Sequence, residues 1–235
     1  MKSKRLLNRG FTLIELLVVI TIIAVLASIS FPVYNKVTMR SKITKDLSNT
    51  RQILMAMKMF GIDNDGVFPT GSIADSDPTS GSGGGGEAST STSAFQELIP
   101  DYINEERIFY TAGNNPLKKR IPDENGTLDA AENCYSYVAG ANDSTESNVP
   151  IIADWFTASG SNYDSQHPWW GAGQAVVGNA DGSAASKKLK KTGQTGFVMS
   201  ADKQSDLFQT RDESGEGGSG TGGMVPSGMV LVHPE

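Results

Sequence analysis

Few residues in this sequence of 235 amino acids have the types and spacing that catalysis requires. Histidine occurs only at His167 and His233, so the sequence holds no histidine pair at the i, i+4 spacing of a helical metal site. It also lacks a Gly-x-Ser-x-Gly nucleophile turn and a phosphate-binding loop with its lysine. We therefore expect no enzymatic activity and no catalytic residue, and we expect His167 to be a surface histidine within a loop.

A single acid, Glu15, interrupts an otherwise uncharged run of 21 residues, 11–31. The run is rich in Leu, Ile and Val, and at about 1.5 Å per residue its helix would span the roughly 30 Å core of a bilayer. An ionised group inside such a helix is costly and normally marks a partner. A cleaved secretory signal would have a shorter apolar run, of about 7–15 residues. A plain membrane anchor fits the length and leaves Glu15 unexplained.

The residues Gly10-Phe11-Thr12-Leu13-Ile14-Glu15 stand between a basic leader, residues 1–10, and the apolar run. They closely resemble the type III signal of prepilins and pseudopilins. The resemblance implies that a prepilin peptidase cleaves after Gly10 on the cytoplasmic side and that the new amino group of Phe11 is methylated. It also implies that Glu15 pairs with the Phe11 ammonium of a neighbouring subunit during assembly. Because either charge alone would be costly in an apolar filament core, the pair would stabilise both and fix the axial register.

Pro32 follows the apolar run and cannot donate the helical hydrogen bond to the carbonyl of Ser28. It predicts a kink or local unwinding, and the alternative is that it marks the exit from the membrane. From residue 33 onward, apolar residues recur at helical spacing with lysines between them, and neither Gly nor Pro occurs over 33–60. We expect a transmembrane helix over 11–32 that continues as an amphipathic helix over 33–62.

Residues 63–235 are expected to form the head, which begins with a turn rich in Asp, Asn and Gly over 61–70. Gly- and Ser-rich stretches predict flexible inserts at about 71–93 and 215–223. A short helix is predicted over 94–102, and a hairpin tip over 179–182. The predicted strands are 134–139, 149–156, 174–177, 183–189, 196–199 and 229–233. The expected fold class is α+β: a long N-terminal helix packed on a small antiparallel sheet, as in pilins, with a loop-rich head.

The turn at 61–70 resembles that of the major pseudopilin of type II secretion. Its acids do not fit an EF-hand loop, because the first and twelfth ligand positions fall on Gly61 and Ser72. In type IVa pilins a disulfide commonly closes the carboxyl-terminal loop, which the single cysteine, Cys134, cannot do. In the major pseudopilin a calcium ion commonly staples that region. We expect no cofactor or metal, leave calcium open, and assign no ligands because the candidate acids are scattered: Asp143, Asp154, Asp164 and Asp181.

The adjacent Trp169 and Trp170 allow two interpretations: they pack beneath their loop, or they form an exposed contact for a partner or carbohydrate. A cluster of four lysines lies within 187–191. We expect it to be a solvated strand edge and not a DNA site. The formal net charge of −6 also argues against nucleic acid as a partner.

The resemblance implies a structural subunit of a type II secretion pseudopilus or a related type IV pilus-like filament. The subunit would wait in the inner membrane, with its N-terminus in the cytoplasm and its head in the periplasm, before it enters a periplasmic or surface filament. Its expected partners are prepilin peptidase, other copies of itself, other pseudopilins, and the secretion or pilus assembly machinery. The alternative is an adhesin or binding module that a pilin stalk displays at the cell surface.

Overall fold

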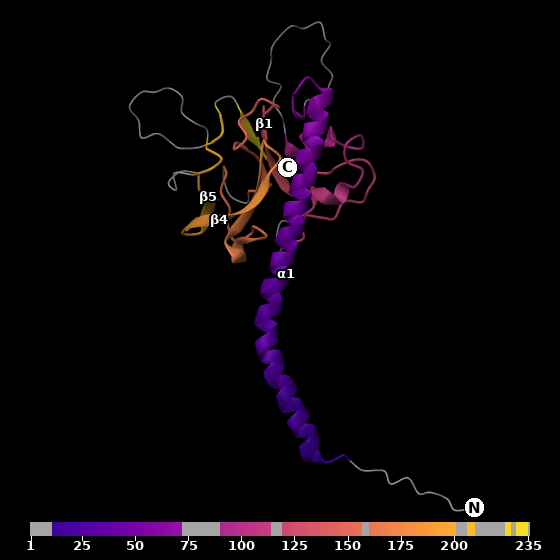
Figure 1. Cartoon of the computed structure of the whole chain (residues 1–235), viewed down its shortest axis with the longest axis vertical. Coiled ribbons are helices and arrows are strands. Elements are labelled where there is room, and N and C mark those ends of the chain that lie inside the picture. The colour runs from indigo at the N-terminus through magenta and orange to yellow at the C-terminus, as the bar shows by residue number, and fades with distance from the viewer. Residues whose placement is uncertain are drawn as a thin grey trace, which may run out of the picture. The chain divides into compact units, whose positions relative to one another are not determined.

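The structure is a computed structural model of the chain (Figure 1). It describes residues 11–71, 90–113, 119–156, 160–200, 206–209, 224–226 and 229–234. The chain divides into two compact units, residues 1–41 and residues 42–235. One long helix, α1 (Leu13–Asp63), begins in the first unit and ends in the second.

In the first unit, α1 is apolar on all sides over residues 16–31, apart from a few hydroxyl groups. Its large apolar side chains up to Val37 are between 47% and 81% exposed, so no described residue of this unit covers them. In the part of the chain that the structure describes, α1 is the one helix long and apolar enough to span a membrane. The helix continues through Pro32 without a break in its assignment, so the kink or unwinding at this residue stays a prediction.

In the second unit, α1 is amphipathic, as the sequence predicts. Ile53, Leu54 and Met57 are buried in the larger of two hydrophobic cores, whereas Met55 and Met59 on the opposite side are exposed. The helix ends at Asp63, close to the predicted limit, and a turn over residues 64–66 follows. The packing of this half of α1 against the head therefore follows from the spacing of its apolar residues.

In the described part of the chain, six antiparallel strands form one sheet in the order β5-β4-β3-β2-β1-β6. Each of the predicted strands and the hairpin tip at 179–182 is found, with bounds that differ by a few residues. The strand that carries the lysine cluster is not the edge strand of the sheet order, so the expectation is wrong in this respect. Its residues 184–188 pair with β3 and its residues 189–192 pair with β5, and Lys188, Lys190 and Lys191 are exposed, as predicted for a solvated strand. The strands are β1 (Tyr135–Ala139), β2 (Pro150–Asp154), β3 (Gln174–Asn179), β4 (Ala184–Thr192), β5 (Thr195–Val198) and β6 (Val230–Val232).

Both faces of the sheet are covered at β1, as its alternating residues show. Tyr135 and Tyr137 belong to the core that contains α1, whereas Val138 belongs to a second core with Tyr163 and Phe208. Every residue of β1 and β2 is therefore buried. This double cover lets the sheet hold polar residues that are fully removed from solvent.

Three short helices lie outside the sheet: α2 (Ser91–Gln96), η1 (Glu106–Phe109) and η2 (Trp170–Ala172). α2 begins and ends earlier than the helix predicted over 94–102. Thr90 caps α2, and the buried Ser91 hydroxyl donates to the Tyr135 carbonyl at 2.7 Å, so the expectation of a flexible insert is wrong for residues 90–93. Apart from Gly71, the remainder of that insert lies outside the described residues, as does the insert at 215–223.

Candidate assembly site and the buried polar groups of the head

Glu15 lies in the first turn of α1, where its carboxylate is held by Thr12. The Thr12 amide and hydroxyl donate to Glu15 Oε2 at 2.8 and 2.6 Å, and the Glu15 amide donates to the Thr12 hydroxyl at 3.3 Å. This reciprocal pattern is a capping box, which satisfies amide groups that a helix start leaves without partners. The carboxylate is therefore positioned by its own chain at the exposed start of the helix.

Phe11 lies next to this capping box and is 72% exposed. Together with Ile14, Glu15, Val18 and Val19 it lines a shallow, mostly apolar hollow on the helix surface. Gly10 lies outside the described residues, so cleavage after this glycine stays a prediction, as does methylation of Phe11. The structure thus brings the proposed new N-terminal residue and the acid of the assembly signal into one exposed turn.

In the head, the side chain of Asp46 on α1 is a buried acceptor. The indole Nε1 of Trp169 donates to its Oδ2 at 2.8 Å, and the hydroxyls of Thr111 and Tyr135 donate to its Oδ1, the former at 3.0 Å. Burial and the neighbouring charge of Asp154 raise the pKa of Asp46 to about 7, against the opposing effect of these hydrogen bonds. The carboxylate holds α1, β1 and two loops together within the head.

A second buried acid, Asp154 at the end of β2, faces His167. The two side chains are fully buried, and His167 Nε2 lies 3.0 Å from Asp154 Oδ2. The amide of Val176 donates to the same oxygen at 3.0 Å. The Trp169 amide donates to His167 Nδ1 at 3.3 Å, which assigns the ring proton to Nε2, facing the carboxylate.

The expectation of a surface position for His167 is therefore wrong, because the side chain is 1% exposed. Its ring packs edge-on against Tyr163 with centroids 4.5 Å apart. Since the ring is buried among Asp154, Tyr163 and the Trp169 amide, the residue has no access to a substrate. We interpret the Asp154–His167 pair as part of the packing of the head.

The two tryptophans have different surroundings. Trp169 is buried and packs beneath its loop, as one of the two interpretations predicts. Trp170 is partly exposed, and the ammonium of Lys191 lies over its ring, 4.0 Å from the centroid. An exposed contact formed by both rings is therefore excluded.

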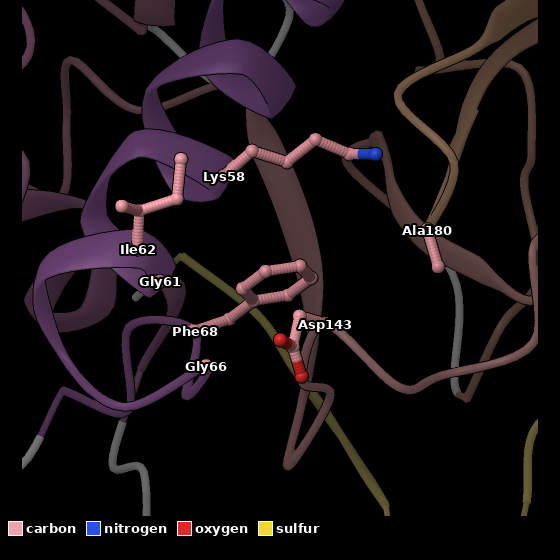
Figure 2. A pocket seen from close by; sticks show the side chains of 7 residues that line it. All are labelled: Lys58, Gly61, Ile62, Gly66, Phe68, Asp143 and Ala180. Atoms are coloured by element: carbon pink, nitrogen blue, oxygen red, sulfur yellow. The ribbon is translucent and has the colours of Figure 1, made fainter.

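A recess lies at the end of α1, where the turn after the helix meets the loop that follows β1 (Figure 2). Phe68 forms its apolar wall, and Lys58 and Asp143 place opposite charges around it. The positive φ of Gly66, 83°, is easily adopted only by glycine, and a Cβ here would lie 2.6 Å from the Asp143 carboxylate. This close approach explains the glycine of the predicted turn.

The four acids considered as calcium candidates serve separate roles. Asp154 is buried in the core, Asp143 lies at the recess, and Asp181 accepts from the Ser183 amide at 2.7 Å in the hairpin tip. Asp164 accepts from the Gln166 amide at 2.8 Å within its own loop. The sequence interpretation missed a different group of acids, Glu106, Asp123 and Glu132, that lies before β1.

Comparisons with known proteins find similarity in limited parts of the chain. The model of the prokaryotic N-terminal methylation motif matches residues 5–31. Over 58 residues, a quarter of this chain, the sequence is 43% identical to the type IV major pilin protein PilA of Myxococcus xanthus, of which the match covers 26%. Over 57 residues it is 40% identical to a type IV major fimbrial protein FimA of Dichelobacter nodosus, of which the match covers 36%. No solved structure matches the chain.

The matched segments span about a quarter to a third of the curated relatives. The chain carries a prepilin-type methylation motif, which confirms the resemblance stated from residues 10–15. Its helix and antiparallel sheet form an α+β fold of the pilin kind. Over about a quarter of its length the chain is similar to type IV pilin and fimbrial proteins.

Proposed function

We propose that this protein is a structural subunit of a type II secretion pseudopilus or a related type IV pilus-like filament. In this proposal, prepilin peptidase cleaves after Gly10, the Phe11 amine is methylated, and subunits assemble through the first half of α1. The observation that carries the proposal is a methylation motif over 5–31 that overlaps the first half of α1, whose large apolar side chains are exposed.

The exposed apolar side chains of α1 need an apolar environment. Burying one Leu, Ile or Val stabilises a structure by about 1.5–3 kcal/mol, so leaving this entire stretch in water is strongly unfavourable. A lipid bilayer covers the stretch before assembly, and the helices of neighbouring subunits cover it in a filament. We place the subunit in the inner membrane with its N-terminus in the cytoplasm and its head in the periplasm.

Glu15 has the position that the proposed pairing requires. Its carboxylate is exposed on the first turn, four residues beyond the future N-terminus at Phe11, and it is preoriented by Thr12. In a filament core, the Phe11 ammonium of a neighbouring subunit would neutralise it. The partners are thus prepilin peptidase, further copies of this chain, related pseudopilins, and an assembly machinery.

Two features favour a pseudopilus over a pilus. The turn over residues 61–70 resembles that of the major pseudopilin, and the single Cys134 is buried and unpaired, so no disulfide closes the head. The curated relatives are named as pilin and fimbrial proteins and do not support this finer choice. Deletion of the gene in its host distinguishes a pseudopilus subunit from a pilus subunit. Loss of a pseudopilin abolishes the secretion of exported proteins, whereas loss of a pilin abolishes surface fibres.

The assembly proposal is tested with Glu15→Gln and Glu15→Ala in the full chain. Glu15→Gln keeps an oxygen that accepts the Thr12 bonds and removes only the charge. Both variants should be processed to a chain that begins at methylated Phe11, which mass spectrometry can measure. Both should fail to enter filaments, which sedimentation of sheared fibres can measure.

Thr21→Ala is the matched control, because it removes a polar group of the same helix that bonds only within it, to the Val18 carbonyl at 2.8 Å. This variant should assemble normally. Normal incorporation of Glu15→Gln, or a native chain that still begins at Met1, would contradict the proposal.

A further inference from the structure

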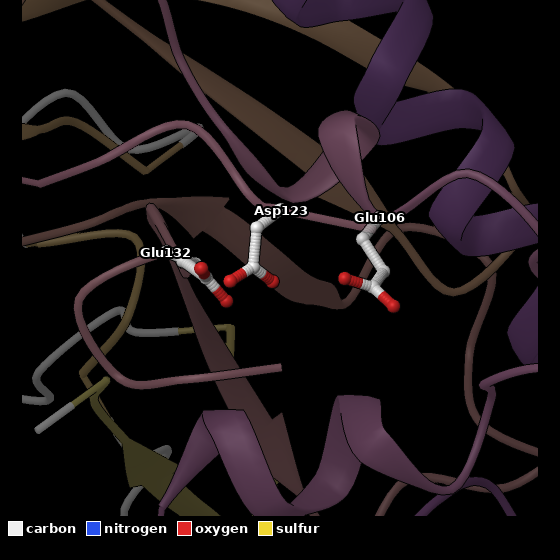
Figure 3. A group of neighbouring side chains, drawn as sticks. All are labelled: Glu106, Asp123 and Glu132. Atoms are coloured by element: carbon white, nitrogen blue, oxygen red, sulfur yellow. The ribbon is translucent and has the colours of Figure 1, made fainter. Parts of the chain in front are cut away.

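Three carboxylates converge in the loop region between η1 and β1: Glu106, Asp123 and Glu132 (Figure 3). One oxygen from each lies within 4.8 Å of the others. Glu106 comes from the start of η1, Asp123 from an irregular segment, and Glu132 from the turn that precedes β1. Glu106 and Glu132, which are 26 positions apart in the sequence, therefore lie close together in the fold.

The burial of these acids is unusual for charged groups. Glu106 is 2% exposed and Glu132 is fully buried, whereas Asp123 is exposed and connects the group to solvent. The Gly126 amide donates to Glu106 Oε1, but Oε2 of the same carboxylate has no hydrogen-bond partner among the described residues. A buried carboxylate oxygen without a partner is strongly unfavourable, so this atom requires a donor or a cation.

Among the ion pairs of the described residues, the one cation that contacts this group is Arg120, which pairs with Glu132 and Asp123. Its guanidinium lies 3.0 Å from Glu132 Oε1 and 3.9 Å from Asp123, and it also pairs with Asp129. No ion pair joins it to Glu106 in the part of the chain that the structure describes. One positive charge thus meets several carboxylates, and Oε2 of Glu106 has neither an ion pair nor a hydrogen-bond partner among the described residues.

The ligand chemistry of the group selects the type of cation. Carboxylate oxygens suit calcium, magnesium and manganese, whereas zinc and copper favour the nitrogen or sulfur ligands that this group lacks. Calcium binds oxygens at about 2.3–2.6 Å, so two ligands on opposite sides of the ion are about 4.8 Å apart. Calcium also accepts an irregular ligand set, whereas magnesium requires near-octahedral geometry.

We propose that Glu106, Asp123 and Glu132 bind a calcium ion, with water completing its coordination on the side of Asp123. The ion compensates the Glu106 carboxylate and cross-links η1, the 119–124 segment and the turn before β1. The site precedes the sheet and lies outside the carboxyl-terminal region. It does not depend on the assembly role of α1.

The test uses the full chain in detergent, treated with EDTA and titrated with calcium chloride. Isothermal titration should show one site with a dissociation constant in the range of about 0.1–1 mM, as in extracellular modules. At 10 mM calcium the midpoint of thermal unfolding should rise by about 5 °C. Magnesium at the same concentration should give less than half of this rise.

Glu106→Gln keeps the oxygen that accepts from Gly126 and removes the charge, so calcium affinity should fall at least tenfold. Glu97→Gln is the matched control, since Glu97 is half-buried and, like Glu106, accepts backbone amides, from Thr70 and Gly71. It should bind calcium as the wild type does. If Glu106→Gln does not fold, the exposed Asp123→Asn tests the same site.

Absence of calcium binding by the wild type overturns the proposal. Undiminished binding by both cluster variants also overturns it, because the ion would then lie elsewhere. An equal rise of the unfolding midpoint with magnesium overturns the assignment to calcium.

Discussion

The indole nitrogen of Trp169 donates a hydrogen bond to Asp46 across 123 residues of sequence, at 2.8 Å. Thr111 and Tyr135 donate to the other oxygen of the same carboxylate. Three separate segments of the head therefore attach to a single side chain of α1. Since hydrogen bonds are directional, this arrangement fixes how the second half of the helix is rotated against the head.

Trp169→Phe should destabilise the head. The substitution removes one hydrogen bond to Asp46 and leaves a small void. At about pH 8, above the pKa of Asp46, the carboxylate is ionised, and a hydrogen bond to a charged partner contributes about 1.5–3 kcal/mol. Thermal and urea unfolding followed by circular dichroism should show a loss in this range. Trp170→Phe, at a partly exposed position, should cost less than about 1 kcal/mol. Equal losses for the two variants would argue against the importance of the Asp46 bond.

Asp46 should make the stability of the head depend on pH. Its pKa is raised from 3.8 to about 7 by burial and by Asp154. As the pH rises from about 4 to 7, the unfolded chain loses this proton while the folded chain retains it. The contribution of Asp46 is therefore complete at low pH and is lost as the pH approaches 7.

Unfolding midpoints measured from pH 4 to 8 should show this loss in the wild type. Asp46→Asn does not titrate, so its midpoint should decline less over the interval. Asp101→Asn, at an exposed position, removes the same charge and should follow the wild type. Parallel curves for Asp46→Asn and the wild type would contradict the assignment.

Gly178→Ala should destabilise the contact between α1 and β3. A Cβ at this position would lie 2.4 Å from Ile152 Cγ2, 2.6 Å from Leu54 Cδ1 and 2.9 Å from Thr50 Cγ2. Overpacking of this kind costs about 1–3 kcal/mol. In a double-mutant cycle with Ile152→Ala, which removes one of the clashing groups, the combined loss should be smaller than the sum of the single losses. Additive losses would indicate that the clash is relieved in another way.

Cys134 should be inert in the folded head. Burial raises the pKa of its thiol to about 12, so the reactive thiolate is scarce at pH 8. Mass spectrometry should detect alkylation by iodoacetamide only after unfolding. An added exposed cysteine, Asp101→Cys, should be alkylated within minutes under the same conditions. Rapid alkylation of Cys134 in the native chain would show that the interior around Cys134 opens to solvent.

The elements could be predicted from local patterns. Each of these patterns depends on residues that are close in the sequence. They are the apolar run, the helical spacing after Pro32, the apolar strands and the Gly-containing hairpin tip. The methylation motif was also recognisable, because all of its residues are contiguous. The position of β4 was missed because the pairing of a strand depends on its neighbours and not on its own lysines.

The buried polar groups could not be predicted for a related reason. His167 stands in a polar, Gly-rich stretch, and its burial depends on Asp154 from β2 and Tyr163 from the opposite core. Glu106 and Glu132 meet only through the path of an irregular loop. The one available signal was an excess of acids over 105–132, which gives composition without geometry.

The place of β6 in the sheet affects the order in which the head can form. This strand supplies one edge of the sheet beside β1, and the His233 carbonyl that follows it accepts from the Ser91 amide at 3.1 Å. While residues 230–232 are still being synthesised or exported, β1 has an open edge that another chain could join. A chaperone that shields β1 during translocation would prevent such mispairing until the last strand arrives.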